Sequence, residues 1–180
     1  MRHVYIILAV VLAVSGVFLL WTGGFKDRAL MFVKSKGYME YTPAEAQEIA
    51  YTKCKQCHPI DKVAKYCMRC GPPFIIVLHN MKKLISIEKN KPGMQWISNM
   101  SDAEAVAITQ VWNALVGNWE DHWREEDLVK LLEGDKTLLS LLNTPVNERD
   151  IETALKGKTA EGTYKEVMKP LPAEGQHTTH

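Results

Sequence analysis

Apolar residues along this chain form one long continuous run and several shorter patterns with helical spacing. The continuous run, from Tyr5 to Trp21, contains no charged residue and is about as long as a helix that crosses a bilayer. Further along, apolar residues recur every three or four positions from Phe74 to Ile87, and again in two short leucine-rich stretches around Gly134. The pattern predicts an all-α chain that begins with an N-terminal transmembrane helix.

Two further helices are marked by the polar residues at their starts. Thr42 stands three positions before Glu45, and this capping-box spacing, with a proline at the first helical position, predicts a helix over residues 43–53. Ser101 has a glutamate at the same spacing and opens a second helix over residues 102–117. These two helices bracket the middle of the chain, where its most distinctive motif lies.

That motif is C-x-x-C-H, formed by Cys54, Cys57 and His58 at the end of the first capped helix. At this spacing two thiols can bond covalently to the vinyl groups of a haem, and the histidine can ligate its iron. Pro72 lies in a Gly-Pro pair where a backbone carbonyl can accept the second ring N–H of such a histidine. Met94 lies in a polar loop before the second capped helix and can reach the open face of the iron.

Residues 41–117, some 77 of the 180, resemble the class I cytochromes c. The resemblance is carried by the C-x-x-C-H motif, Gly71-Pro72, Gly93-Met94 and the closing helix. In that family an N-terminal helix crosses the C-terminal helix beside the haem, and Trp112 matches the aromatic residue packed in that crossing. The resemblance implies one covalent haem c, bound through both thiols of the motif, with His58 and Met94 as axial ligands.

The resemblance also implies a function. We expect a membrane-anchored monohaem cytochrome that carries single electrons between a respiratory or photosynthetic membrane complex and a redox partner protein. Such a protein is an electron carrier and not an enzyme, and the sequence has no paired acids or activated nucleophile that would indicate a small-molecule substrate. The formal net charge of +1 gives no basic face for nucleic acid.

We expect four segments along the chain. They are a transmembrane anchor at 1–24, a juxtamembrane amphipathic segment at 25–40, a cytochrome c-like haem domain at 41–117 and a helical extension with a flexible tail at 118–180. Haem of this type is attached on the outer side of the bacterial membrane, which implies a single-pass protein with its haem domain in the periplasm. The basic residues that follow the apolar run favour the opposite orientation, and a cleaved signal peptide is the alternative to an anchor.

The four cysteines allow a different interpretation. Cys54, Cys57, Cys67 and Cys70 form two C-x-x-C pairs with the ligand number of a tetrahedral zinc site, as in a zinc-ribbon membrane adaptor. The spacer between the pairs is short for a zinc ribbon, and no strand pattern flanks them. Outside the cytoplasm we instead expect a local disulfide between Cys67 and Cys70, with a redox-active dithiol as the alternative.

The sixth ligand of the iron also has alternatives. His79, Met81 and Met100 can compete with Met94 for that position. If none of them binds tightly, the iron is open to a gas, and the protein is a haem-based sensor.

Overall fold

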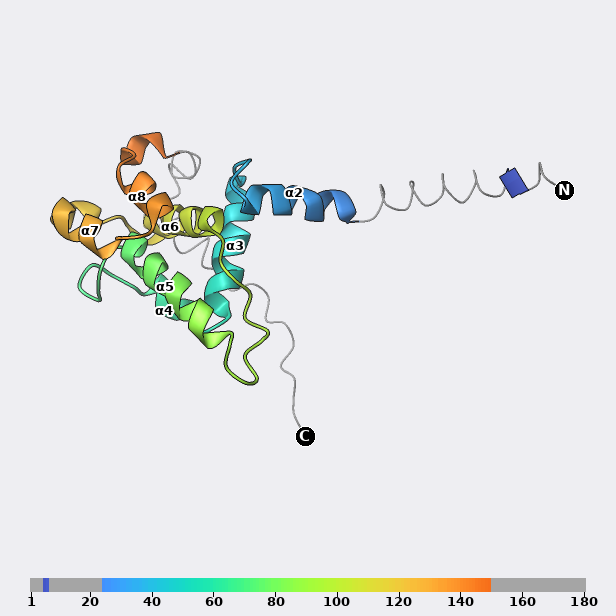
Figure 1. Cartoon of the computed structure of the whole chain (residues 1–180). Coiled ribbons are helices and arrows are strands. Elements are labelled where there is room, and N and C mark those ends of the chain that lie inside the picture. The colour runs from blue at the N-terminus through green and yellow to red at the C-terminus, as the bar shows by residue number, and fades with distance from the viewer. Residues whose placement is uncertain (1–4, 7–23, 150–180) are drawn as a thin grey trace. The chain divides into compact units, whose positions relative to one another are not determined.

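The computed structural model describes residues 5–6 and 24–149 (Figure 1). It contains seven α-helices, and none of the described residues forms a strand. The chain divides into two units, residues 1–40 and 41–180. The helices are α2 (Phe25–Ser35), α3 (Pro43–Lys55), α4 (Ile60–Ala64), α5 (Phe74–Glu88), α6 (Asp102–Val116), α7 (Glu125–Leu131) and α8 (Lys136–Leu142), with short 3-10 turns at η1 (Glu120–His122) and η2 (Val146–Glu148).

The N-terminal part of the fold prediction needs correction. In the described part of the chain, no helix is long and apolar enough to cross a membrane. The longest, α5 and α6, have 15 residues, about 22 Å of helix against a hydrocarbon core of about 30 Å. The expected span from Tyr5 to Trp21 lies almost entirely outside the described residues. The predicted transmembrane helix and single-pass membrane location therefore have no part in the function proposed below.

The first unit contributes α2 to the described structure. This helix ends where Gly37 adopts a left-handed conformation, with φ of 78°, which a residue with a side chain rarely adopts. In its last turn the Lys36 ammonium lies 5.4 Å from the centre of the Phe32 ring.

In the second unit, α3 and α6 begin where their capping boxes predict. The Thr42 backbone N–H donates to the Glu45 carboxylate over 2.7 Å, and the Ser101 backbone N–H donates to Glu104 over 2.7 Å. In each box the hydroxyl of the first residue also accepts from the backbone N–H of the glutamate. Because these bonds satisfy donors that a helix start leaves unpaired, each start is fixed by residues only three positions apart.

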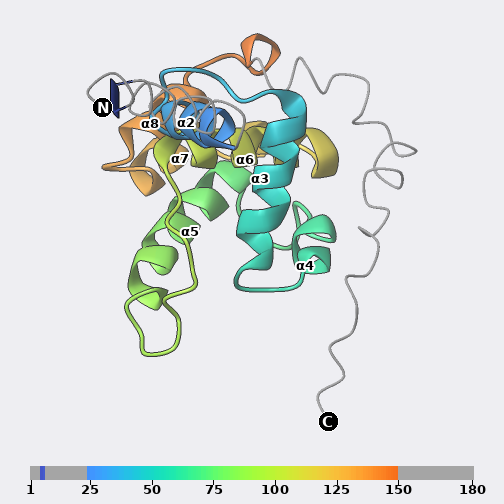
Figure 2. The same ribbon diagram turned by 90° about the vertical axis from the view of Figure 1, so that its right-hand side faces the viewer.

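Helix α6 is the centre of the second unit, since α3, α5 and α8 all pack against it. Ten of its fifteen residues are buried, and Ile108, Val111 and Trp112 are fully buried. Figure 2 shows α4 beside the C-terminal end of α3. This arrangement places the end of α3, which carries the C-x-x-C-H motif, next to the aromatic side chains of the core.

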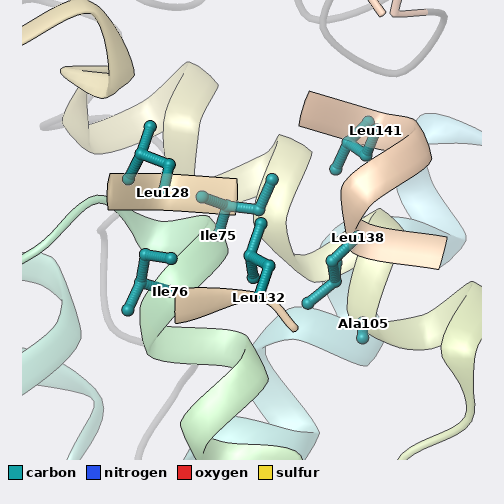
Figure 3. Close-up of a cluster of buried hydrophobic side chains, with 7 residues drawn as sticks. All are labelled: Ile75, Ile76, Ala105, Leu128, Leu132, Leu138 and Leu141. Carbon is teal, nitrogen blue, oxygen red and sulfur yellow. The ribbon is translucent and has the colours of Figure 1, made fainter. Parts of the chain in front are cut away.

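The described part of the extension, residues 118–149, packs on the rest of this unit. Figure 3 shows the cluster that joins α5, α6, α7 and α8, made of Ile75, Ile76, Ala105, Leu128, Leu132, Leu138 and Leu141. A buried ion pair adds to it, because the Arg149 guanidinium lies 2.8 Å from the Glu120 carboxylate. Asn113 of α6 donates to the same carboxylate over 3.1 Å. Residues 118–149 therefore complete the core of this unit.

Candidate functional site

The C-x-x-C-H residues lie at the edge of an apolar pocket in the second unit. Cys54, Cys57 and His58 line it together with core side chains that include Phe74 and Trp112. The remaining wall comes from α4, α5 and the residue before α6: Val63, Val77, Leu78, Met81, Ile85 and Met100, with Lys53 at one side. The structure thus brings both motif thiols and the histidine to one pocket, as the motif predicts.

The local sequence explains how the motif is presented. Helix α3 ends at Lys55, and Pro59 disfavours further helix because the residue before a proline avoids helical geometry. Cys54 therefore stays on the last turn of α3 and is half-buried, whereas Cys57 is exposed in the turn that follows. His58, in the same turn, is half-buried.

The two motif thiols differ in their surroundings. Burial raises the pKa of the Cys54 thiol to about 11, although the nearby indole of Trp112 lowers it in part. The Trp112 Nε1 is itself buried and has no hydrogen bond of normal geometry. At neutral pH Cys54 is therefore a protonated thiol in an apolar setting.

Aromatic rings form a continuous cluster behind the pocket. Trp112 lies 6.2 Å from Phe74 and 5.4 Å from Tyr51, measured between ring centres. Phe74 in turn lies 5.2 Å from Tyr66 and 5.6 Å from Trp119. These spacings are typical of packed aromatic pairs, so the cluster gives the pocket a rigid apolar floor.

Two predicted site residues lie outside the pocket wall. Pro72 is not among the lining residues, and its carbonyl accepts the Tyr66 hydroxyl over 3.1 Å. The Nδ1 atom of His58 instead lies 3.4 Å from the carbonyl of Pro59. Met94 is also outside the wall, in a turn where its N–H donates to the carbonyl of Lys91. The predicted roles of Pro72 and Met94 remain predictions.

Of the alternative sixth ligands, the structure places two in the pocket and one elsewhere. Met81 and Met100 both line the pocket. His79 is buried against α8, where its Nδ1 lies 3.2 Å from the Asp135 carboxylate, and it lines a separate hollow of about 530 Å³. The Asp135 carboxylate also accepts from Lys82 over 2.7 Å. His79 therefore belongs to a charged cluster between α5 and α8.

Several contacts that the sequence did not predict hold the segment before α6 against the end of α3. Gln56 exchanges two hydrogen bonds with Ser98, one from its amide over 2.8 Å and one from the Ser98 backbone N–H over 3.0 Å. Lys53 donates to the Ser98 hydroxyl over 3.0 Å and to the carbonyl of Asn99, and lies 3.2 Å from the Glu104 carboxylate. These partners are more than 40 residues apart, so no local pattern signals them.

The second cysteine pair does not join the first. Cys67 and Cys70 are bonded to each other in a disulfide, while Cys54 and Cys57 are free thiols. Within the described residues, which include all four cysteines, no three His, Cys, Asp or Glu side chains are grouped so that they could hold a metal ion. The geometry therefore gives no support to the four-cysteine zinc site.

The pocket residues fit a covalent haem by their chemistry. Two thiols, one imidazole, two thioethers and an apolar aromatic floor are the groups that c-type attachment and axial ligation require. The enclosed space is about 60 Å³, much less than the roughly 300–1,000 Å³ of sites that enclose small ligands. A haem would therefore need the pocket to widen.

Comparison of the chain with protein-family models, with curated proteins and with solved structures finds no match. The function is therefore inferred from the geometry of this pocket and from its motif.

Proposed function

We propose that this protein is a monohaem c-type cytochrome that carries single electrons between redox partner proteins. The observation that carries the proposal is the placement of Cys54, Cys57 and His58 together at the edge of one apolar pocket with an aromatic floor. The haem iron would supply the one-electron chemistry by changing between its ferrous and ferric states.

Different residues of the pocket would have different roles in binding the haem. The two thiols would anchor it covalently, and the His58 imidazole would ligate its iron. Phe74 and Trp112 exclude water from the pocket, which limits the reorganisation that accompanies electron transfer and favours a carrier. Widening requires movement of one wall, and the hydrogen bonds that tie the segment before α6 to Gln56 and Lys53 are exposed, although Ile97 of that segment is buried.

The sixth ligand decides between a carrier and a sensor. Met94 remains the ligand implied by the family resemblance, while Met81 and Met100 are favoured by their place in the wall. Single alanine variants at the three positions separate these choices. Only loss of the true ligand should abolish the weak near-infrared band of methionine-to-iron charge transfer and open the iron to carbon monoxide. Rapid binding of carbon monoxide by the unaltered protein would favour the sensor.

Charge along the chain indicates what kind of partner would dock near the pocket. Residues 53–91, which contain the motif and most of the pocket wall, hold nine Lys and Arg against two Asp and Glu. Residues 102–149 have the opposite balance, with four Lys and Arg against ten Asp and Glu. A redox partner with an acidic surface would be steered to the pocket side, and its association rate should fall as salt is added.

Haem staining after denaturing electrophoresis tests the proposal. The unaltered chain, produced in cells that attach c-type haem, should keep its stain, and Cys54→Ser should lower the yield of stained protein. The matched control is Cys67→Ser/Cys70→Ser, which removes the other pair and should keep the stain. Full retention of haem in Cys54→Ser/Cys57→Ser would refute covalent attachment at this motif.

A further inference from the structure

The Cys67–Cys70 disulfide lies on the surface, although it is close in sequence to the pocket residues. Both cysteines and the two residues between them are exposed, and Met68 is 46% exposed. The same four residues form a C-x-x-C sequence, the spacing of dithiols that exchange with other thiols. A reductant can therefore reach either sulfur without unfolding the chain.

The loop that carries the disulfide is closed without it. The Tyr66 hydroxyl donates to the carbonyl of Pro72 over 3.1 Å and so joins the residue before Cys67 to the second residue after Cys70. Within the loop, the Cys70 N–H donates to the carbonyl of Cys67 over 2.8 Å. Gly71 adds to this closure, because a side chain there would collide with the Tyr66 hydroxyl.

A disulfide across so short a loop also restricts the unfolded chain little. The two cysteines are three positions apart, and the stabilisation expected from a cross-link falls as the loop it closes becomes shorter. The bridge is thus accessible and adds little to a loop that hydrogen bonds already close. A bridge with a purely structural role is expected to be buried and to hold together a loop that is otherwise open.

We propose that Cys67 and Cys70 are a thiol–disulfide exchange site that accepts two electrons from a dithiol reductant. A thiolate of the reductant attacks one bridge sulfur, forms a mixed disulfide and releases the other cysteine as a thiolate, which takes up a proton. The second thiol of the reductant then attacks the mixed disulfide, releases the first cysteine and leaves the reductant oxidised. The chain gains two electrons and two protons, and the reductant loses them.

Arg69, between the two cysteines, assists this exchange. It is exposed, directly precedes Cys70 and stands two positions after Cys67, so its positive charge would stabilise the thiolate that leaves. Arg69→Gln should slow reduction about two- to threefold, and Arg69→Lys should keep most of the rate. A rate unchanged in Arg69→Gln would overturn this role of the arginine.

The exchange is tested by treating the full chain with dithiothreitol, trapping thiols with an alkylating reagent and weighing the intact protein. We expect two additional alkyl groups in the native chain, appearing at a rate within about tenfold of that for the urea-unfolded chain. Native reduction more than about tenfold slower than this would show a protected, structural bridge and overturn the proposal. Cys67→Ser/Cys70→Ser is the control, since it should gain no alkyl groups on reduction.

The same experiment separates this proposal from the haem proposal. Alkylation before reduction reports Cys54 and Cys57, which are blocked if they carry haem and free if they do not. The gain on reduction reports only Cys67 and Cys70. A second measurement compares urea unfolding of the control variant with that of the unaltered chain, and similar midpoints are expected because hydrogen bonds already close the loop. A large drop in the midpoint would indicate a structural bridge.

Discussion

Replacing Arg149 with methionine should strongly destabilise the second unit. The Arg149 side chain is 2% exposed and makes two parallel bonds to the Glu120 carboxylate, of 2.8 and 3.1 Å, while its Nε donates to the carbonyl of Thr144 over 3.0 Å. The variant leaves the Glu120 carboxylate buried, with Asn113 as its remaining side-chain partner. Removing one partner of a buried pair costs about 3–5 kcal/mol, a large part of the 5–15 kcal/mol of a typical domain.

Urea unfolding followed by circular dichroism measures this cost. Glu120→Gln in the same chain should recover part of the loss, because the uncompensated charge is then gone, and a double-mutant cycle should give a coupling of about 0.5–3 kcal/mol. The matched control is Arg124→Met, which breaks the exposed pair with Asp127 and should change stability little. A loss below about 1 kcal/mol for Arg149→Met would contradict a buried, stabilising ion pair, since that is the value of an exposed pair.

Three further predictions concern single side chains of the second unit. Burial alone would raise the pKa of Asp135, but the hydrogen bonds it accepts outweigh this effect and lower the pKa in the folded chain. The stabilisation that this carboxylate contributes is therefore complete above about pH 4 and is lost as the pH falls through its lowered pKa. Asp135→Asn should flatten this acid dependence of the stability measured by urea unfolding. In the chain without haem, Cys54, with its pKa of about 11, should alkylate more slowly than Cys57 at pH 8, and equal rates by mass spectrometry would contradict its burial. Gly71→Ala should cost about 1–3 kcal/mol because its methyl group meets the Tyr66 hydroxyl, and Tyr66→Phe should relieve the cost; additive losses in urea unfolding would contradict the collision.

The parts of the fold that local interactions determine were predictable from the sequence. The starts of α3 and α6 follow from capping boxes whose partners are three residues apart, at Thr42 and at Ser101. The motif also predicted that Cys54, Cys57 and His58 lie together, since five adjacent residues in a helix end and its turn cannot separate far.

The rest of the candidate site depends on contacts between distant residues. The segment before α6 is positioned by hydrogen bonds from α3, so whether Met94 or Met100 lines the pocket is decided by partners more than 40 residues away. The Pro72 carbonyl accepts the Tyr66 hydroxyl, which competes with the predicted hydrogen bond from the His58 ring. No spacing rule in the sequence reveals this competition. The transmembrane helix predicted from the N-terminal apolar run is not supported, because no helix among the described residues is long and apolar enough to cross a membrane.

The pyridine haemochrome spectrum tests covalent haem attachment most directly. It is recorded on protein that has been purified from cells that attach c-type haem and then extracted with acid acetone. We expect one haem per chain to stay with the protein and to give the spectrum of a haem bound through two thioethers at Cys54 and Cys57. Protein that retains no haem after this extraction, or that contains zinc and no haem, would contradict this expectation.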